Sequence, residues 1–176
     1  MADTSIEVVK RYLQDAIAAE KSFETQLHGF AKETRNEQAK TVLESHLTET
    51  RGQIERLTNR LEQLGDTPST AKSLLAHVFQ LAPKAAQLSR DKEGRGTEAS
   101  TTQDLILAFA IENNECAIYE SLASTAEAAG DPETAALARS IQAEEKAAAN
   151  RIWSLLGSAA RSEYLATTAE SASFSS

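Results

Sequence analysis

The chain of 176 residues has few of the residues that interrupt helices or cross-link a fold: one cysteine, three prolines and seven glycines. A single cysteine, Cys116, excludes an internal disulfide, so the fold needs no oxidising compartment. Aromatic residues make up only 5% of the chain, which is instead rich in Ala, Leu, Glu and Gln. This composition favours an all-helical protein over a sheet protein.

Positive charge is also scarce. Lysine and arginine number 18 against 26 acidic residues, a formal charge of −8 at pH 7. Without a basic face, the chain is not expected to bind nucleic acid or an anionic membrane surface. It has no apolar run long enough to cross a bilayer, and its first residues, MADTSIEVVKRYLQ, lack the features of a signal peptide. We therefore expect a cytoplasmic protein.

Apolar residues recur at helical spacing in four long segments. The helices are expected from about Thr4 to Phe30, from Asn36 to Gly65, from the segment EASTTQD to Gly130, and from Asp131 to about Leu156. Asp131 is a favourable N-cap residue, and a proline follows it at the first helical position. Between the second and third helices, residues 66–100 form a long connection with a shorter helical pattern over 74–81.

The lengths of the connections predict how the helices are arranged. Short links make two antiparallel hairpins, and one long link can cross the whole bundle between them. A four-helix bundle with a single long crossover is the ferritin-like arrangement, which we expect over residues 1–157. Residues 158–176, rich in Ser, Thr and Ala, are expected to form a flexible C-terminal tail.

Each predicted helix places carboxylates or other polar groups on its apolar face or at the border of that face. They are Glu20 in the first helix, His46, Glu49 and Gln53 in the second, Glu112 and Glu115 in the third, and Glu144 and Glu145 in the fourth. All lie near the middle of their helices, so antiparallel packing can bring them to the same level along the axis of the bundle. Buried carboxylates take up protons or bind a cation, because an isolated buried charge costs several kcal/mol. This many acids with a histidine favour two divalent metal ions bridged by carboxylates.

The sequence resembles the YciE/YciF family of ferritin-like bacterial stress proteins. The resemblance lies in four segments in order: AAEKSFETQL, HLTETRGQIERLTNRLEQLG, AFAIENNECAIYESL and AAGDPETAALARSIQAEEKAA. It implies a ferritin-like bundle, usually a homodimer, with a dinuclear metal site. The implied ligands are Glu20, Glu49, Glu112 and one of Glu144 and Glu145. His46, Gln53 and Glu115 would be additional ligands or would support the ligands.

The chain departs from the usual ferritin-like pattern, which has Glu-x-x-His in the second and fourth helices. The residue three after Glu49 is Gly52, and Ala147, Ala148 and Ala149 supply no histidine in the fourth helix. The site is therefore expected to be rich in carboxylates. Oxygen ligands favour hard ions, so iron or manganese is the expected metal.

Three functions fit these residues. In the first, a di-metal protein reacts with oxygen or peroxide: Glu20 and Glu112 are terminal ligands, Glu49 and Glu145 (or Glu144) bridge, and His46 and Gln53 orient them. In the second, a metal-free structural or interaction protein keeps its acids protonated or paired with arginines. Candidate partners are Arg56, Arg60 and Arg151. In the third, the protein buffers metal ions without turnover.

Overall fold

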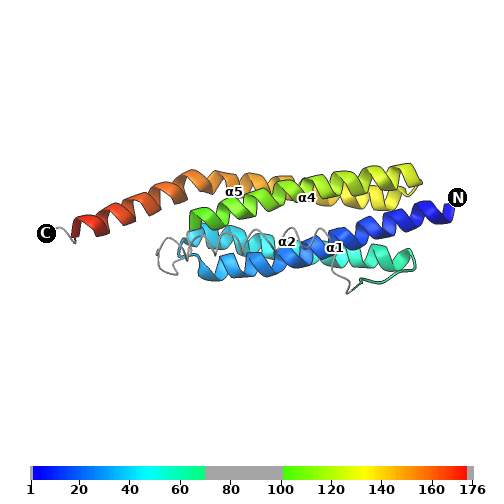
Figure 1. The fold of residues 1–176 in the computed structure, drawn as a ribbon, viewed down its shortest axis with the longest axis horizontal. Coiled ribbons are helices and arrows are strands. Elements are labelled where there is room, and N and C mark those ends of the chain that lie inside the picture. Colours follow the sequence, from blue (N-terminus) through cyan, green and yellow to red (C-terminus); the bar gives the residue numbers. More distant parts are fainter. Residues whose placement is uncertain (1, 70–100, 174–176) are drawn as a thin grey trace.

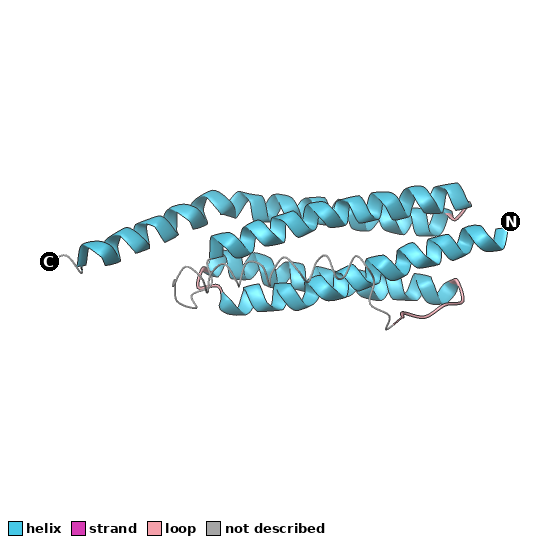
Figure 2. Cartoon of the chain, in the orientation of Figure 1, coloured by secondary structure: helices cyan, strands magenta, loops and turns pink. Residues whose placement is uncertain are grey.

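Four long helices form the part of the chain that the computed structural model describes, residues 2–69 and 101–173. They are α1 (Ala2–Glu33), α2 (Glu37–Gln63), α4 (Thr101–Ala129) and α5 (Pro132–Ser173) (Figure 1). These two stretches of chain contain no strand (Figure 2), so the all-helical prediction is confirmed for them. The short helix expected over 74–81 lies outside the described residues.

The helices form two antiparallel hairpins, α1 with α2 and α4 with α5 (Figure 1). The hairpins pack against each other through α1 with α4 and α2 with α5. The C-terminal end of α2 and the start of α4 lie at opposite ends of the bundle, so the connection between them joins the two ends. This is the predicted ferritin-like topology.

Capping residues set the helix boundaries where the sequence predicted them. The Asn36 side chain accepts a hydrogen bond from the Ala39 N–H at 3.0 Å and begins α2. Gly130 has φ +74°, a backbone conformation that glycine adopts without strain, and it turns the chain from α4 into α5. Asp131 then accepts the Thr134 N–H at 3.0 Å, ahead of Pro132 at the first position of α5.

The core is a continuous column of apolar side chains on the inner faces of all four helices. Its largest fully buried aliphatic and aromatic members are Leu13, Phe23, Leu27, Leu43, Leu57, Leu61, Leu105, Tyr119, Leu122, Ile141 and Ile152. With the smaller buried residues between them, such as Val9 before Leu13 and Ala138 before Ile141, the core positions are mostly three and four residues apart, which is typical of the seam of a bundle. No helix within the described residues is both long enough and apolar enough to span a membrane.

The fourth predicted helix ends much later than expected. We placed its end near Leu156, whereas α5 continues through Gly157 to Ser173, so the predicted end is wrong. A single glycine costs a helix only about 1 kcal/mol relative to alanine, and the alanine-rich segment beyond it contains no proline. The extension is tied to the bundle: Ala159 is buried, and Glu163 accepts the Thr102 N–H at 2.9 Å at the start of α4.

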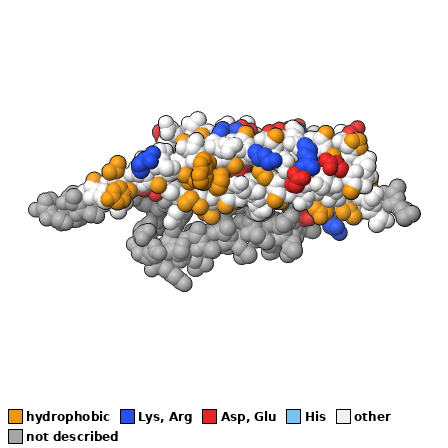
Figure 3. All heavy atoms as spheres, turned by 90° about the horizontal axis from the view of Figure 1, so that it is seen from above, with side chains coloured by type: hydrophobic (Ala, Val, Ile, Leu, Met, Phe, Trp, Pro, Cys, Tyr) orange, Lys and Arg blue, Asp and Glu red, His pale blue; other side chains and the backbone are white. Residues whose placement is uncertain are grey.

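Some large apolar side chains remain on the surface of the bundle. Ile106, Trp153, Tyr164 and Leu165 are each more than half exposed. Trp153 lies against Phe109, with 5.2 Å between the ring centroids. Apolar side chains gather on this side of the molecule, which is formed by α4 and α5 (Figure 3).

The contacts of Asp131 predict that its removal destabilises the fold more than removal of the Asn36 cap. Asp131 also accepts hydrogen bonds from the Thr134 hydroxyl and from Arg60 Nη2, the latter at 2.6 Å, and so links the turn to α2. We expect Asp131→Ala to lower the free energy of unfolding by about 2 kcal/mol and Asn36→Ala by about 1 kcal/mol. Urea denaturation measures both, and equal losses would contradict the contribution of Arg60.

Candidate metal centre

Six polar side chains lie buried near the middle of the bundle, each at most 1% exposed. They are Glu20 from α1, His46 and Gln53 from α2, Glu112 and Glu115 from α4, and Glu145 from α5. All six are residues that the sequence pattern selected. They come together because they lie on the inner faces of antiparallel helices, near their midpoints. We refer to these six residues as the buried cluster.

His46, Glu112 and Glu145 form the most compact part of the buried cluster. His46 Nε2 lies 2.7 Å from Glu112 Oε1 and 3.7 Å from Glu145 Oε2. One ligand atom from each residue lies within 4.8 Å of the other two. Three helices thus contribute one nitrogen and two carboxylates to a space that one cation would fill.

Glu20 and Glu115 extend the buried cluster toward α1. The Tyr119 hydroxyl donates a hydrogen bond to Glu20 Oε1. The second oxygen of Glu20 and both oxygens of Glu115 are buried without a hydrogen-bond partner. Tyr119 has the spacing of a core residue, and its contact with Glu20 could not be read from the sequence because the two residues belong to different hairpins.

Glu49 and Glu144, the other two predicted acids, lie at the rim of the buried cluster. Each side chain is 35% exposed. Glu49 Oε2 lies 3.3 Å from His46 Nδ1 and also accepts a hydrogen bond from Arg151. Of the Glu144–Glu145 pair, which the sequence left open, the structure places Glu145 inside and Glu144 outside.

Glu144 is held from both sides at this rim. Arg56 donates to both of its oxygens, with 2.9 Å from Nη1 to Oε1. Gln53 Nε2 donates to Glu144 Oε2 at 3.2 Å and also donates to Glu145. Gln53 therefore connects the rim to the interior.

The arginines contact the rim acids rather than the buried ones. Arg56 and Arg151 bind Glu144 and Glu49, while Arg60 binds Asp131 and Glu133. Among the described residues, no salt bridge joins an arginine to a carboxylate of the buried cluster. Pairing with arginine, one of the expected alternatives, therefore does not account for the four buried acids.

The donor atoms of the buried cluster fit a metal ion. Six of its oxygens have no hydrogen-bond partner: Glu20 Oε2, Gln53 Oε1, Glu112 Oε2, Glu115 Oε1, Glu115 Oε2 and Glu145 Oε2. Leaving a polar atom buried and unpaired costs about 1–3 kcal/mol. Carboxylate oxygens with one imidazole nitrogen suit Fe(II) or Mn(II), and a bound cation would satisfy these lone pairs.

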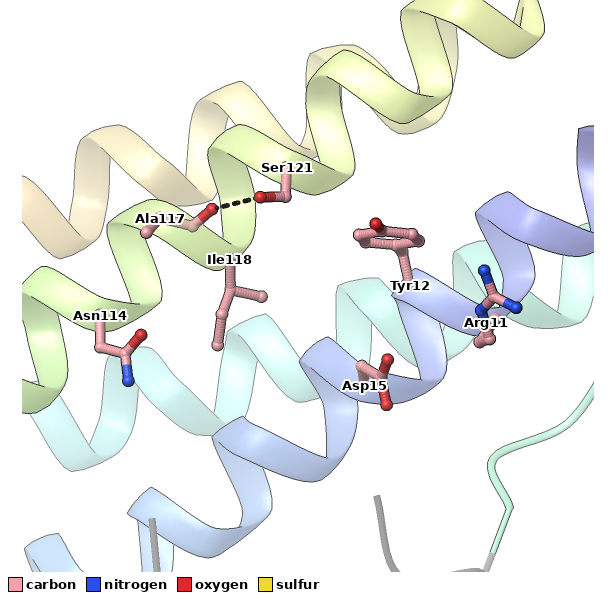
Figure 4. Close-up of a pocket in the computed structure, with 7 residues that line it drawn as sticks. All are labelled: Arg11, Tyr12, Asp15, Asn114, Ala117, Ile118 and Ser121. Atoms are coloured by element: carbon pink, nitrogen blue, oxygen red, sulfur yellow. Dashed lines mark hydrogen bonds between the residues drawn. The ribbon is translucent and has the colours of Figure 1, made fainter. Parts of the chain in front are cut away.

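A separate groove of about 400 Å³ lies on the surface between α1 and α4. Figure 4 shows the seven side chains that line it: Arg11, Tyr12, Asp15, Asn114, Ala117, Ile118 and Ser121. The Ser121 hydroxyl donates to the Ala117 carbonyl of its own helix at 2.9 Å. None of the lining residues belongs to the buried cluster, so the groove is not part of the candidate metal centre.

Residues 5–165 match a protein family described as "Domain of unknown function (DUF892)". The chain is 31% identical over 138 residues to Protein YciF of Escherichia coli K12, covering 77% of this chain and 80% of that protein. The crystal structure of the E. coli stress protein YciF superposes with a TM-score of 0.73 at 26% identity, over 88% of this chain and 96% of that one.

Two further solved structures share the fold. A protein from Xanthomonas campestris gives a TM-score of 0.76 at 23% identity, over 94% of this chain and 99% of that one. A Dps protein from Bacillus brevis gives 0.65 at 19% identity, over 87% and 97% of the two chains. At these identities the likeness shows the fold alone.

Burial sets the protonation of the clustered acids. Desolvation, increased by neighbouring carboxylates, raises the pKa of Glu20 to about 8. Burial likewise raises the pKa of Glu112 to about 8, and burial together with the neighbouring Glu112 raises that of Glu145 to about 9. Burial and the nearby carboxylates also raise the pKa of Glu115 well above its usual value. At neutral pH and without a cation, these acids therefore hold protons.

At the rim, the arginine has the opposite effect. Partial burial alone would raise the pKa of Glu144, but the hydrogen bonds and charge of Arg56 outweigh it and lower that pKa below its usual value. Glu144 is therefore a carboxylate at neutral pH. The centre thus combines neutral acids inside with an ionised, paired acid at the rim.

The raised pKa values predict that the metal-free protein becomes less stable as pH rises. Between the ordinary value of 4.5 and about 8–9, the folded state binds more protons than the unfolded state, so stability falls across this window. The slope is about 1.4 kcal/mol per pH unit for each carboxyl still protonated in the native state. Acids whose pKa is lowered in the folded state, such as Glu144, change the stability only at pH values below this range.

Urea denaturation with a chelator present, from pH 5 to pH 9, measures this slope. Glu115→Gln should flatten it, because the amide keeps the shape of the side chain and does not titrate. Glu133→Gln, at a side chain 75% exposed, is the control and should leave the slope unchanged. A stability that is constant from pH 5 to pH 8 would contradict the prediction.

Proposed function

The chain belongs to the DUF892 family, and from this membership and the buried cluster we propose that it is a stress-associated, ferritin-like protein that binds a dinuclear iron or manganese site. The association with stress comes from its similarity to the E. coli stress protein YciF. The observation that carries the metal proposal is the set of buried oxygens in the cluster that have no hydrogen-bond donor. These oxygens are stabilised when a cation accepts their lone pairs.

The ligand roles follow from where the side chains lie. His46, Glu112 and Glu145 would hold one ion, because their donor atoms already converge. Glu20 and Glu115 would hold the second, with the free oxygens of Glu112 and Glu145 available to bridge. These assignments give His46 a more central role than the sequence suggested, and give Glu49 the task of orienting the His46 ring through Nδ1.

Bound iron or manganese would supply redox chemistry with oxygen or peroxide. The chain's own contribution is an enclosed site: the acids of the cluster are almost fully buried among apolar side chains. Tyr119, through its hydrogen bond to Glu20, fixes the position of that carboxylate. The raised pKa values of the acids mean that protons leave the site as a cation enters, so metal affinity should rise with pH.

Metal buffering without turnover is the second candidate, and it rests on the same cluster. The two functions differ only in whether the loaded protein consumes oxygen or peroxide. A metal-free structural protein, the third candidate, requires the buried acids to remain protonated and predicts no response to metal. Metal binding therefore separates the third candidate from the first two, and an oxygen-electrode assay separates the first from the second.

Glu112→Gln tests the proposal without leaving a cavity. In wild type, Mn(II), or Fe(II) without oxygen, should raise the melting temperature, because a ligand bound only by the native state stabilises it. Elemental analysis should find about two ions per chain, as in di-metal bundles. Glu112→Gln should lose most of this shift, yet its metal-free form should be at least as stable as wild type at pH 8, because a buried acid has been removed.

The control for this experiment is Glu120→Gln, a surface substitution in the same helix that removes one negative charge from a side chain 54% exposed. It should keep the full metal response. A wild-type protein that takes up neither ion, or a Glu112→Gln variant that responds like wild type, would refute the dinuclear site.

We also propose that the protein is a homodimer, as the family resemblance implies. The exposed apolar side chains on the side of α4 and α5, above all Trp153 at 62% exposure, support this (Figure 3). Sedimentation velocity should show a dimer, and Trp153→Glu should shift it to monomer by burying a charge in the interface. A dimer that Trp153→Glu leaves intact would mean that the copies meet elsewhere.

A further inference from the structure

Two ion pairs cross between α2 and α5 beside the buried cluster. Arg151 of α5 binds Glu49 of α2, and Arg56 of α2 binds Glu144 of α5. In each helix the arginine follows the glutamate by seven residues. Each antiparallel helix therefore contributes one glutamate and one arginine, and each of these pairs with the oppositely charged residue of the other helix. All four side chains are 35–38% exposed, which places both ion pairs at the boundary with solvent.

Each glutamate of these pairs also contacts the interior. Glu49 lies 3.3 Å from His46 Nδ1, and the other nitrogen of that ring contacts Glu112 at 2.7 Å. Glu144 accepts from Gln53, whose amide also donates to Glu145. On both sides, one side chain therefore separates a solvent-exposed carboxylate from a buried one.

Between the two ion pairs, α2 and α5 carry small residues. Gly52 of α2 has no side chain, and a Cβ placed there would meet no atom within 4 Å. The corresponding position of α5, three residues after Glu144, carries only the methyl group of Ala147. Of the four helix pairs that pack side by side, α2 and α5 have the least extensive contact. Among the described helices, α2 and α5 thus combine small residues between the two ion pairs with the least extensive packing.

We propose that the face between α2 and α5 is the entrance by which divalent cations reach the buried cluster, and that Arg56 and Arg151 are positioning residues that hold Glu144 and Glu49 at its rim. The inference rests on the proposed metal site. While paired, each arginine cancels the charge of its glutamate. Once a pair opens, the carboxylate attracts a cation and lies beside Gln53 or His46, on the way to the interior.

The energies of the ion pairs suit this role. A pair exposed to this extent contributes little to stability, so an arriving cation can displace the arginine. An unpaired carboxylate attracts a divalent cation with about twice the energy of a monovalent one. Fixed negative charge at an entrance raises the association rate of cations and makes it depend on salt.

Stopped-flow mixing of metal-free protein with Mn(II), with a dye reporting free Mn(II), tests this inference. Arg56→Gln and Arg151→Gln should each accelerate binding about three- to tenfold at low salt, with the gain lost at high salt. Glu49→Gln and Glu144→Gln should slow it by a similar factor. Arg56→Lys and Arg151→Lys keep the charge and should bind at close to the wild-type rate.

Arg139→Gln is the matched control, because Arg139 pairs with Glu120 and Glu127 of α4 on another face and its removal changes the net charge equally. If it accelerates binding as much as Arg56→Gln, net charge is the cause and the entrance is refuted. If wild type binds Mn(II) at equilibrium but the rim variants leave the rate unchanged, the entrance is refuted while the metal site stands. If wild type binds none at equilibrium, the proposed function fails and the entrance with it.

Discussion

The burial of four carboxyl groups in the middle of the bundle is the constraint on which the rest of the structure depends. Glu20, Glu112, Glu115 and Glu145 are buried at positions where bundles ordinarily place aliphatic side chains. Their cost has to be offset by the apolar residues on either side, such as Leu13 and Leu27, which hold the helices together without help from this layer. Thus the fold can be stable while its centre remains suited to a ligand.

Such a layer forms only if the four helices keep their axial register, and contacts at both ends of the bundle maintain it. At one end, Arg60 of α2 binds Asp131 at the start of α5, at 2.6 Å. At the other, Glu163 of α5 accepts the Thr102 N–H at the start of α4. Both contacts join residues far apart in the sequence on different helices, so sliding one helix by a turn would break them and separate the acids.

Much of the architecture and of the interior set of acids follows from the sequence, because helical periodicity and caps are local signals. Asp131 marked the start of α5 correctly. The end of that helix was missed, because its stability past Gly157 comes partly from Ala159 and Glu163 packing on other helices. A contact with a distant helix leaves no local signal.

The arrangement inside the site shows the same limit. Adjacent residues differ by about 100° around a helix, so Glu145 lies on the apolar stripe and Glu144 at its flank. The sequence leaves open which of them faces the cluster, and packing places Glu145 inside. The ion pairs of Arg56 and Arg151 depend on which helices are neighbours. The sequence supplied these arginines as possible partners of buried acids, whereas the structure shows them bound to acids at the rim.

The departures from the ferritin-like pattern bear on both the proposed metal centre and the proposed entrance. The histidines that are missing would stand three residues after Glu49 and Glu145, and those positions hold Gly52 and Ala148. Gly52 is partly exposed, whereas Ala148 is fully buried, so a histidine at position 148 would point into the bundle. Without these histidines, the proposed centre would consist of carboxylates with His46 as an imidazole ligand. Gly52 thus bears on both proposals, because it supplies no nitrogen donor and follows Glu49 by three residues at the proposed entrance.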